Sequence, residues 1–100
     1  MTKFHIEWKG NVSMSSEEYA NLPTITLSLL EMVKDSVKSN KVTDWGTYCD
    51  LRTGYMIMEG TQDEIMPELL KYMPYVLFDV KPVVNVDQAI EAIKATKHLE

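Results

Sequence analysis

The clearest pattern in the chain is a strict alternation of apolar and polar residues over positions 3–9. Phe4, Ile6 and Trp8 form the apolar set, and the residues between them are polar. A period of two is typical of a half-buried β-strand. We therefore predict a first strand that turns one face to the core and keeps a polar second face.

A first helix is predicted over residues 15–39. Ser15 and Glu18 have the spacing of a capping box, which marks a helix start. Apolar residues then recur every three or four positions over residues 25–37, the spacing of an amphipathic helix. Pro23 lies early in this segment, so the helix either kinks there or restarts with the proline in its first turn.

A second helix is predicted after Thr61, which forms another capping-box pattern with Glu64. Apolar residues follow at helical spacing over residues 65–73. The helix start is open between Thr61 and Asp63, because Pro67 would lie deep inside a helix that Thr61 caps.

Three further segments have the composition of strands. Residues 42–51 and 54–59 are rich in β-branched and aromatic types, and their short connection predicts a hairpin in which Gly54 supplies a positive φ. Residues 76–84 form another apolar, β-branched run. Its Pro82 predicts that this strand lies at a sheet edge or contains a bulge.

The predicted order is strand, helix, strand, strand, helix, strand, and a start pattern at residues 85–88 adds a short last helix. This is the ferredoxin-like βαββαβ plan of an α+β protein, a four-stranded antiparallel sheet with two helices on one face. The uncovered face is then an interface or a binding surface. With 100 residues the chain is expected to form one domain over residues 1–98, and Leu99 and Glu100 have the look of a cloning remnant.

Charge and cysteine content narrow the partners and the compartment. Ten basic residues against 15 acidic ones give a net charge of -5, which disfavours nucleic acid. No apolar stretch reaches the length of a membrane span, and the N-terminus lacks a signal-peptide pattern. The single Cys49 cannot form an internal disulfide. We therefore expect a cytoplasmic protein that binds neither nucleic acid nor membrane.

Four segments together resemble a known superfamily. They are residues 4–6 (Phe-His-Ile), 54–59 (Gly-Tyr-Met-Ile-Met-Glu), 61–64 (Thr-Gln-Asp-Glu) and 75–82 (Tyr-Val-Leu-Phe-Asp-Val-Lys-Pro). These segments look like the dimeric α/β-barrel superfamily, especially its muconolactone-isomerase-like branch. The resemblance implies a homodimer in which two ferredoxin-like sheets pack together around a small organic molecule, aromatic or cyclic. It also implies cofactor-free isomerase or oxygenase chemistry.

The polar face of the first strand supplies the first candidate catalytic residues, His5 and Glu7. They are two positions apart, so their side chains leave the same face of a strand. A carboxylate fixes the tautomer of a neighbouring histidine and raises its basicity, which suits a general base or half of a metal site. A hydrogen-bonding pair at a strand edge or dimer seam is the structural alternative. His5 matches a strand histidine of the isomerase-like branch, whereas Glu7 stands where that branch has a lysine.

The hairpin supplies the other candidates. Tyr48 is a candidate catalytic hydrogen-bond donor, and Asp50 on the same face is a candidate for ligand binding. Tyr55 is a candidate ligand contact, and Arg52 would clamp a ligand carboxylate with its planar fork. Each has a structural alternative: the polar edge of a strand for Tyr48, a turn residue for Asp50, a core residue for Tyr55, and a solvated turn residue or inter-subunit ion pair for Arg52.

The sequence contains no cofactor signature. It has no glycine-rich phosphate loop, no zinc-type cysteine and histidine spacing and no acidic calcium loop, so we expect no cofactor and no metal. Two classes of function stay open. One is a homodimer that binds a small organic molecule, with or without catalysis. The other is a non-catalytic ligand-sensing or protein-interaction module that uses the same sheet face.

Overall fold

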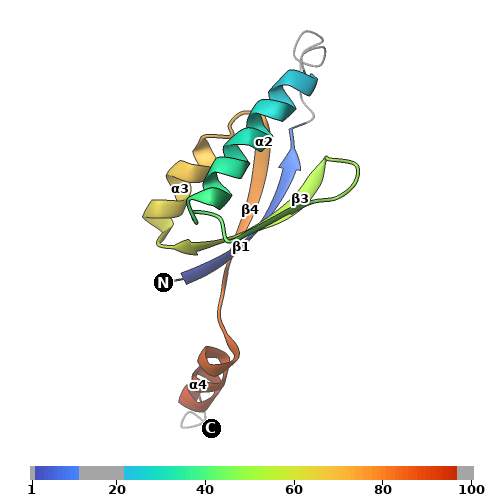
Figure 1. The fold of residues 1–100 in the computed structure, drawn as a ribbon. Helices are drawn as coiled ribbons and strands as arrows, with labels where there is room; N and C mark the ends of the chain where they lie inside the picture. Colours follow the sequence, from blue (N-terminus) through green and yellow to red (C-terminus); the bar gives the residue numbers. More distant parts are fainter. Residues whose placement is uncertain (1, 12–21, 97–100) are drawn as a thin grey trace.

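A computed structural model describes residues 2–11 and 22–96 of the chain (Figure 1). The elements within these residues are β1 (Thr2–Gly10), α2 (Leu22–Lys38), β2 (Asp44–Thr47), β3 (Thr53–Gly60), α3 (Gln62–Leu70), β4 (Val76–Val83) and α4 (Val86–Thr96). The predicted order of strands and helices is confirmed over this part of the chain. The predicted capping box of Ser15 and Glu18 and the two last residues lie outside it.

The four strands form one antiparallel sheet in the order β2-β3-β1-β4. The central strand β1 pairs with β3 and β4, and Phe4 stands opposite Met58 on one side and Pro82 on the other. Figure 1 shows α2 and α3 on the same face of this sheet. The arrangement is compatible with the ferredoxin-like plan, and β4 is an edge strand, as Pro82 predicts.

The core lies between the sheet and the two helices. Phe4 and Ile6 of β1 stand opposite Met58 and Met56 of β3, and all four side chains are buried. Val42 and Ile65 complete this cluster. The apolar set of the first strand therefore faces the helices, because alternate side chains of a strand leave opposite faces of the sheet.

The start of α3 is fixed by its cap. The Thr61 side chain accepts a hydrogen bond from the Glu64 backbone N–H, and the Glu64 carboxylate accepts one from the Thr61 backbone N–H at 3.1 Å. The capping box is thus confirmed with Thr61, not Asp63, as the cap. Pro67 lies inside the helix. The remaining backbone hydrogen bonds and the buried side chain of Ile65 stabilise the helix despite the proline.

The turn between β2 and β3 differs from the prediction. β2 covers only Asp44–Thr47, and the positive φ of 61° belongs to Leu51, so the assignment of a positive φ to Gly54 was wrong. Leu51 N–H donates to the Tyr48 carbonyl at 2.9 Å, which closes the turn before the strand begins. Gly54 lies within β3 and is needed there for another reason: a Cβ would collide with the Gly46 carbonyl and the Trp8 indole.

One ion-paired carboxylate stabilises the helical layer. Glu68 Oε1 accepts hydrogen bonds from Lys71 Nζ at 2.9 Å and from Lys41 Nζ at 3.1 Å, and the Glu68 side chain is only 15% exposed. The bond from Lys71 contributes most to holding the pKa of Glu68 below its ordinary value, with partial burial opposing it and Lys41 assisting.

Replacing Glu68 by Gln should lower the free energy of unfolding by about 1 kcal/mol at pH 7. Because the folded pKa is lowered, the contribution is present above the ordinary value of 4.5 and is lost as the pH falls through the lower folded value. Urea unfolding at pH 7 and at pH 3 measures this, with exposed Glu59→Gln as the control. A Glu68→Gln effect of equal size at both pH values would contradict the ion-pair argument.

The last helix, α4, stands apart from the rest of the protein. It follows β4 beyond the end of the sheet, away from α2 and α3 (Figure 1). The chain measures 60 × 28 × 26 Å with a radius of gyration of 17.1 Å, whereas a compact chain of this length has about 13 Å. The predicted start is confirmed, because Asn85 and Gln88 exchange hydrogen bonds of 2.9 and 2.8 Å in a capping box. None of the helices in the described residues is long and apolar enough to cross a membrane.

Candidate functional site

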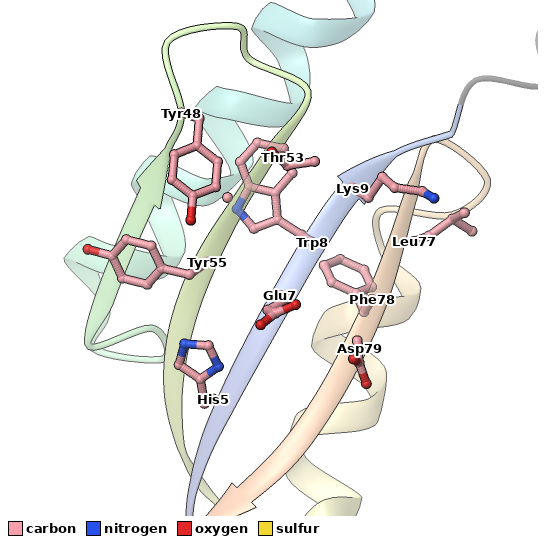
Figure 2. Close-up of a pocket in the computed structure, with 11 residues that line it drawn as sticks. His5, Glu7, Trp8, Lys9, Tyr48, Thr53, Tyr55, Leu77, Phe78 and Asp79 are labelled. Carbon is pink, nitrogen blue, oxygen red and sulfur yellow. The ribbon is translucent and has the colours of Figure 1, made fainter.

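The sheet face opposite α2 and α3 carries a shallow pocket of about 520 Å³ (Figure 2). Small-molecule sites commonly have about 300–1,000 Å³. His5 and Glu7 of β1, Tyr55 of β3 and Asp79 of β4 line it, together with Tyr48 just after β2. The pocket therefore draws side chains from three strands and a turn.

The strand register explains why these side chains meet. Glu7 stands opposite Tyr55 on one side and Asp79 on the other, while His5 stands opposite Ile57 and Lys81. All are odd-numbered positions of paired strands, and they leave the sheet on the face that the core residues do not use. Four of the predicted site residues, His5, Glu7, Tyr48 and Tyr55, are thus gathered in one place.

His5 and Tyr55 form an aromatic pair on this face. Their rings are parallel within 2°, with centroids 6.5 Å apart, and Figure 2 shows them on neighbouring strands. They occupy diagonal positions across β1 and β3, where aromatic side chains can still reach each other. Two parallel rings offer aromatic surface on which a planar molecule can stack.

The Tyr55 ring is held in place by two residues of β2. Its hydroxyl donates a hydrogen bond to Asp44 Oδ2 at 3.2 Å, and the ring lies over Gly46, where a Cβ would collide with it. This hydrogen bond, and then the negative charge of Asp44, raise the pKa of Tyr55 above its ordinary value. The phenol therefore stays protonated and fixed in direction at neutral pH.

Negative charge dominates the part of the pocket around Glu7. Glu7 and Asp79 are directly opposite each other on β1 and β4, an arrangement that is unfavourable for like charges. Lys81 Nζ approaches Asp79 Oδ2 at 3.7 Å and offsets one of the two charges. Within the described residues Glu7 has no hydrogen bond to His5, so its carboxylate is open to a donor from a ligand.

The other two predicted site residues, Asp50 and Arg52, lie outside the pocket. Asp50 and Arg52 are exposed in the β2–β3 turn, where Asp50 Oδ1 accepts a hydrogen bond from the Arg52 backbone N–H at 3.0 Å. This geometry is that of a turn. Tyr48 borders the pocket with a side chain that is 65% exposed.

Several residues of the site were not predicted from the sequence. Asp79 and Leu77 line the pocket from β4, Lys9 lines it from β1, and Asp44 and Gly46 position Tyr55. Two features of the sequence could have indicated these residues. One is the alternation of charge along β4, and the other is the glycine inside β2, because a glycine within a strand often marks the close approach of another group.

Neither a group of metal ligands nor a match to a known protein gives further information about this pocket. Among the described residues no group of three or more histidine, cysteine, aspartate or glutamate side chains could hold a metal ion, so His5 and Glu7 have no third ligand there. No protein-family model matches the chain, and no curated protein matches it either.

Proposed function

We propose that the protein is a homodimer that binds a small planar organic molecule between the open faces of its two sheets. The observation that carries the proposal is the uncovered face itself, which joins the parallel rings of His5 and Tyr55 to apolar Ile57 and Leu77. A domain of this size buries a modest fraction of its surface, so covering such a face with a second copy adds stability.

The charges of the pocket favour an uncharged or basic ligand. Glu7 and Asp79 lie together, and Arg52, the residue suited to a carboxylate, is outside the pocket. A phenol, an aromatic amine or a neutral cyclic ketone fits this surface better than an aromatic acid. The ring of the ligand would stack on His5 and Tyr55, and the hydroxyl of a phenol or the amino group of an aromatic amine would donate a hydrogen bond to Glu7.

Cofactor-free proton transfer is the reaction class for which these side chains are suited. A neutral imidazole at His5 accepts a proton from an acidic C–H group, and the phenol of Tyr48 donates a hydrogen bond to the oxygen on which negative charge develops. Both side chains line the same pocket.

A non-catalytic module that senses a ligand or binds a protein is the second candidate. It is favoured by the missing hydrogen bond between His5 and Glu7 within the described residues, because an oriented histidine is the usual mark of a general base. The same face would then bind its partner without turnover.

The first test is the mass in solution, measured by light scattering after size exclusion at micromolar concentration. We expect twice 11.5 kDa for the intact chain and a shift towards 11.5 kDa for Ile57→Lys, which places a charge at the centre of the open face. Leu27→Lys is the matched control, because Leu27 is exposed on α2, in the opposite layer. Ile57→Lys and its control are both measured in an Ile90→Lys background, which charges the exposed apolar side of α4, so that only the sheet face is left to join two copies. Unchanged mass of Ile57→Lys in this background would refute pairing through the sheets.

The second test uses 2-naphthol as a planar neutral probe in an NMR titration of backbone amides. Shifts should concentrate on β1 and β3, and Tyr55→Ala should weaken binding about three- to tenfold through loss of stacking. Tyr75→Ala, outside the pocket, is the control. If both variants bound 2-naphthol with equal affinity, the His5–Tyr55 ring pair would not contribute to binding.

The third test separates catalysis from binding. Deuterium exchange of the acidic C–H protons of 2-tetralone in heavy water is followed by NMR, with and without protein. Acceleration that disappears in His5→Ala supports proton transfer. Binding without acceleration favours the non-catalytic module.

A further inference from the structure

Helix α4 has an apolar face that no other part of residues 2–11 and 22–96 buries. Val86, Ile90 and Ile93 lie along one side of the helix, and each is between 46% and 71% exposed. An isolated helix of 11 residues is marginal in water, because helices shorter than about 12–15 residues depend on packing. A partner surface for α4 is therefore required.

A matching surface lies on α3 and the turn that follows it. Met66, Leu70 and Met73 form a stripe whose members are 57–60% exposed. The members of both stripes are four and then three residues apart, although Met73 lies in the turn just past the end of α3.

The charges beside the two stripes are complementary when the helices run antiparallel. Asp63 stands near the start of α3 and Lys71 directly follows its end, while Asp87 and Lys94 occupy the start and the end of α4. In antiparallel packing Asp87 approaches Lys71 and Lys94 approaches Asp63. In parallel packing the two acidic ends meet, which is unfavourable.

The topology allows antiparallel packing only between two copies of the chain. β3 and β4 are both antiparallel to β1, so they end at the same end of the sheet. α3 begins directly after β3, and α4 begins directly after β4. If α4 folded back over its own helical layer, it would run parallel to its own α3 and bring Asp87 towards Asp63.

We propose that α4 is an exchange arm that packs antiparallel on the α3 stripe of a second copy. The proposal goes beyond the sheet pairing put forward above, because it uses the helical layer and does not need the open sheet face. Ile93 of one copy then lies beside Met66 of the other, and Val86 lies beside Met73.

Disulfide cross-linking between two differently labelled chains tests this register. In a Cys49→Ser background, one chain carries Ile93→Cys and an isotope-labelled chain carries Met66→Cys. Mild oxidation of the mixture should give the mixed dimer in about tenfold higher yield than the parallel-register control, Val86→Cys with Met66→Cys, because a disulfide requires Cα atoms within about 7 Å.

The outcomes are distinct from those of the sheet-pairing test. Equal yields in both registers, or no mixed dimer, would overturn the proposal. So would a chain with both Ile93→Cys and Met66→Cys that closes an intramolecular disulfide when diluted. Ile57→Lys disturbs only the sheet face, so a failure of sheet pairing leaves the α4 cross-link in place. A lower yield with Lys71→Glu that Asp87→Lys restores would support the antiparallel charge pairing.

Discussion

Replacing Ile6 by Ala is expected to lower the free energy of unfolding by about 3 kcal/mol, within the usual 2–5 kcal/mol for such core truncations. Ile6 has no exposed surface and lies on the central strand, opposite Met56 and Val80. Neighbours on both sides of the strand prevent the site from collapsing around the smaller side chain. Because native domains are stable by only about 5–15 kcal/mol, this loss is a substantial fraction of the total stability.

Urea unfolding followed by tryptophan fluorescence measures this effect. Leu27→Ala is the matched control, since the Leu27 side chain is 59% exposed on α2 and its truncation should change stability by less than about 0.5 kcal/mol. If Ile6→Ala behaved like Leu27→Ala, the core would not be centred on β1.

Replacing Gly54 by Ala should cost about 2 kcal/mol, although it adds a single methyl group. The new Cβ would collide with the Gly46 carbonyl, which is backbone, and with the Trp8 indole. The indole cannot yield freely, because Trp8 Nε1 donates to the same Gly46 carbonyl at 3.2 Å and its ring stacks on Trp45 with centroids 5.5 Å apart. The substitution therefore forces the β2–β3 pair apart or displaces the ring stack.

The control for Gly54→Ala is the same change at Gly10, the last residue of β1. Among the described residues, a Cβ at Gly10 would meet the Arg52 carbonyl oxygen at 3.7 Å, an ordinary contact. Gly10→Ala should leave stability unchanged or raise it slightly, because alanine loses less backbone freedom on folding. Near-ultraviolet circular dichroism reports the tryptophan stack directly. Equal stability and equal spectra for both variants would contradict the close approach at Gly54.

Local signals predicted most of the fold. The alternation around Ile6 identified β1 and its core face, and the pairs Thr61 with Glu64 and Asn85 with Gln88 marked two helix starts. Such patterns depend on residues a few positions apart, which the chain brings together without help from distant segments.

The β2–β3 turn could not be predicted in the same way. A left-handed conformation at Leu51 is uncommon for a branched side chain, and it is set here by hydrogen bonds within the turn. The real constraint on Gly54 comes from Trp8, 46 positions earlier in the chain, and no local pattern reports that contact.

From the sequence, the residues of the site could be predicted only for each strand separately. His5 with Glu7, and Tyr55, follow from alternation along β1 and β3, but their grouping depends on the register between strands. Asp79 joins them through the pairing of β4 with β1. Asp50 and Arg52, close to the site in sequence, lie outside it, exposed in the β2–β3 turn.

The outer edge of β4 has a consequence for assembly in crowded solution. In the described part of the chain this strand of eight residues has a neighbour on one side only, so its other side could template a strand from another molecule. Asp79 and Lys81 place charges along that edge, and Pro82 provides no backbone N–H for a new ladder. The charges in the middle of β4 and the proline near its end therefore disfavour the addition of a further strand at this edge, the first step of fibrillar aggregation.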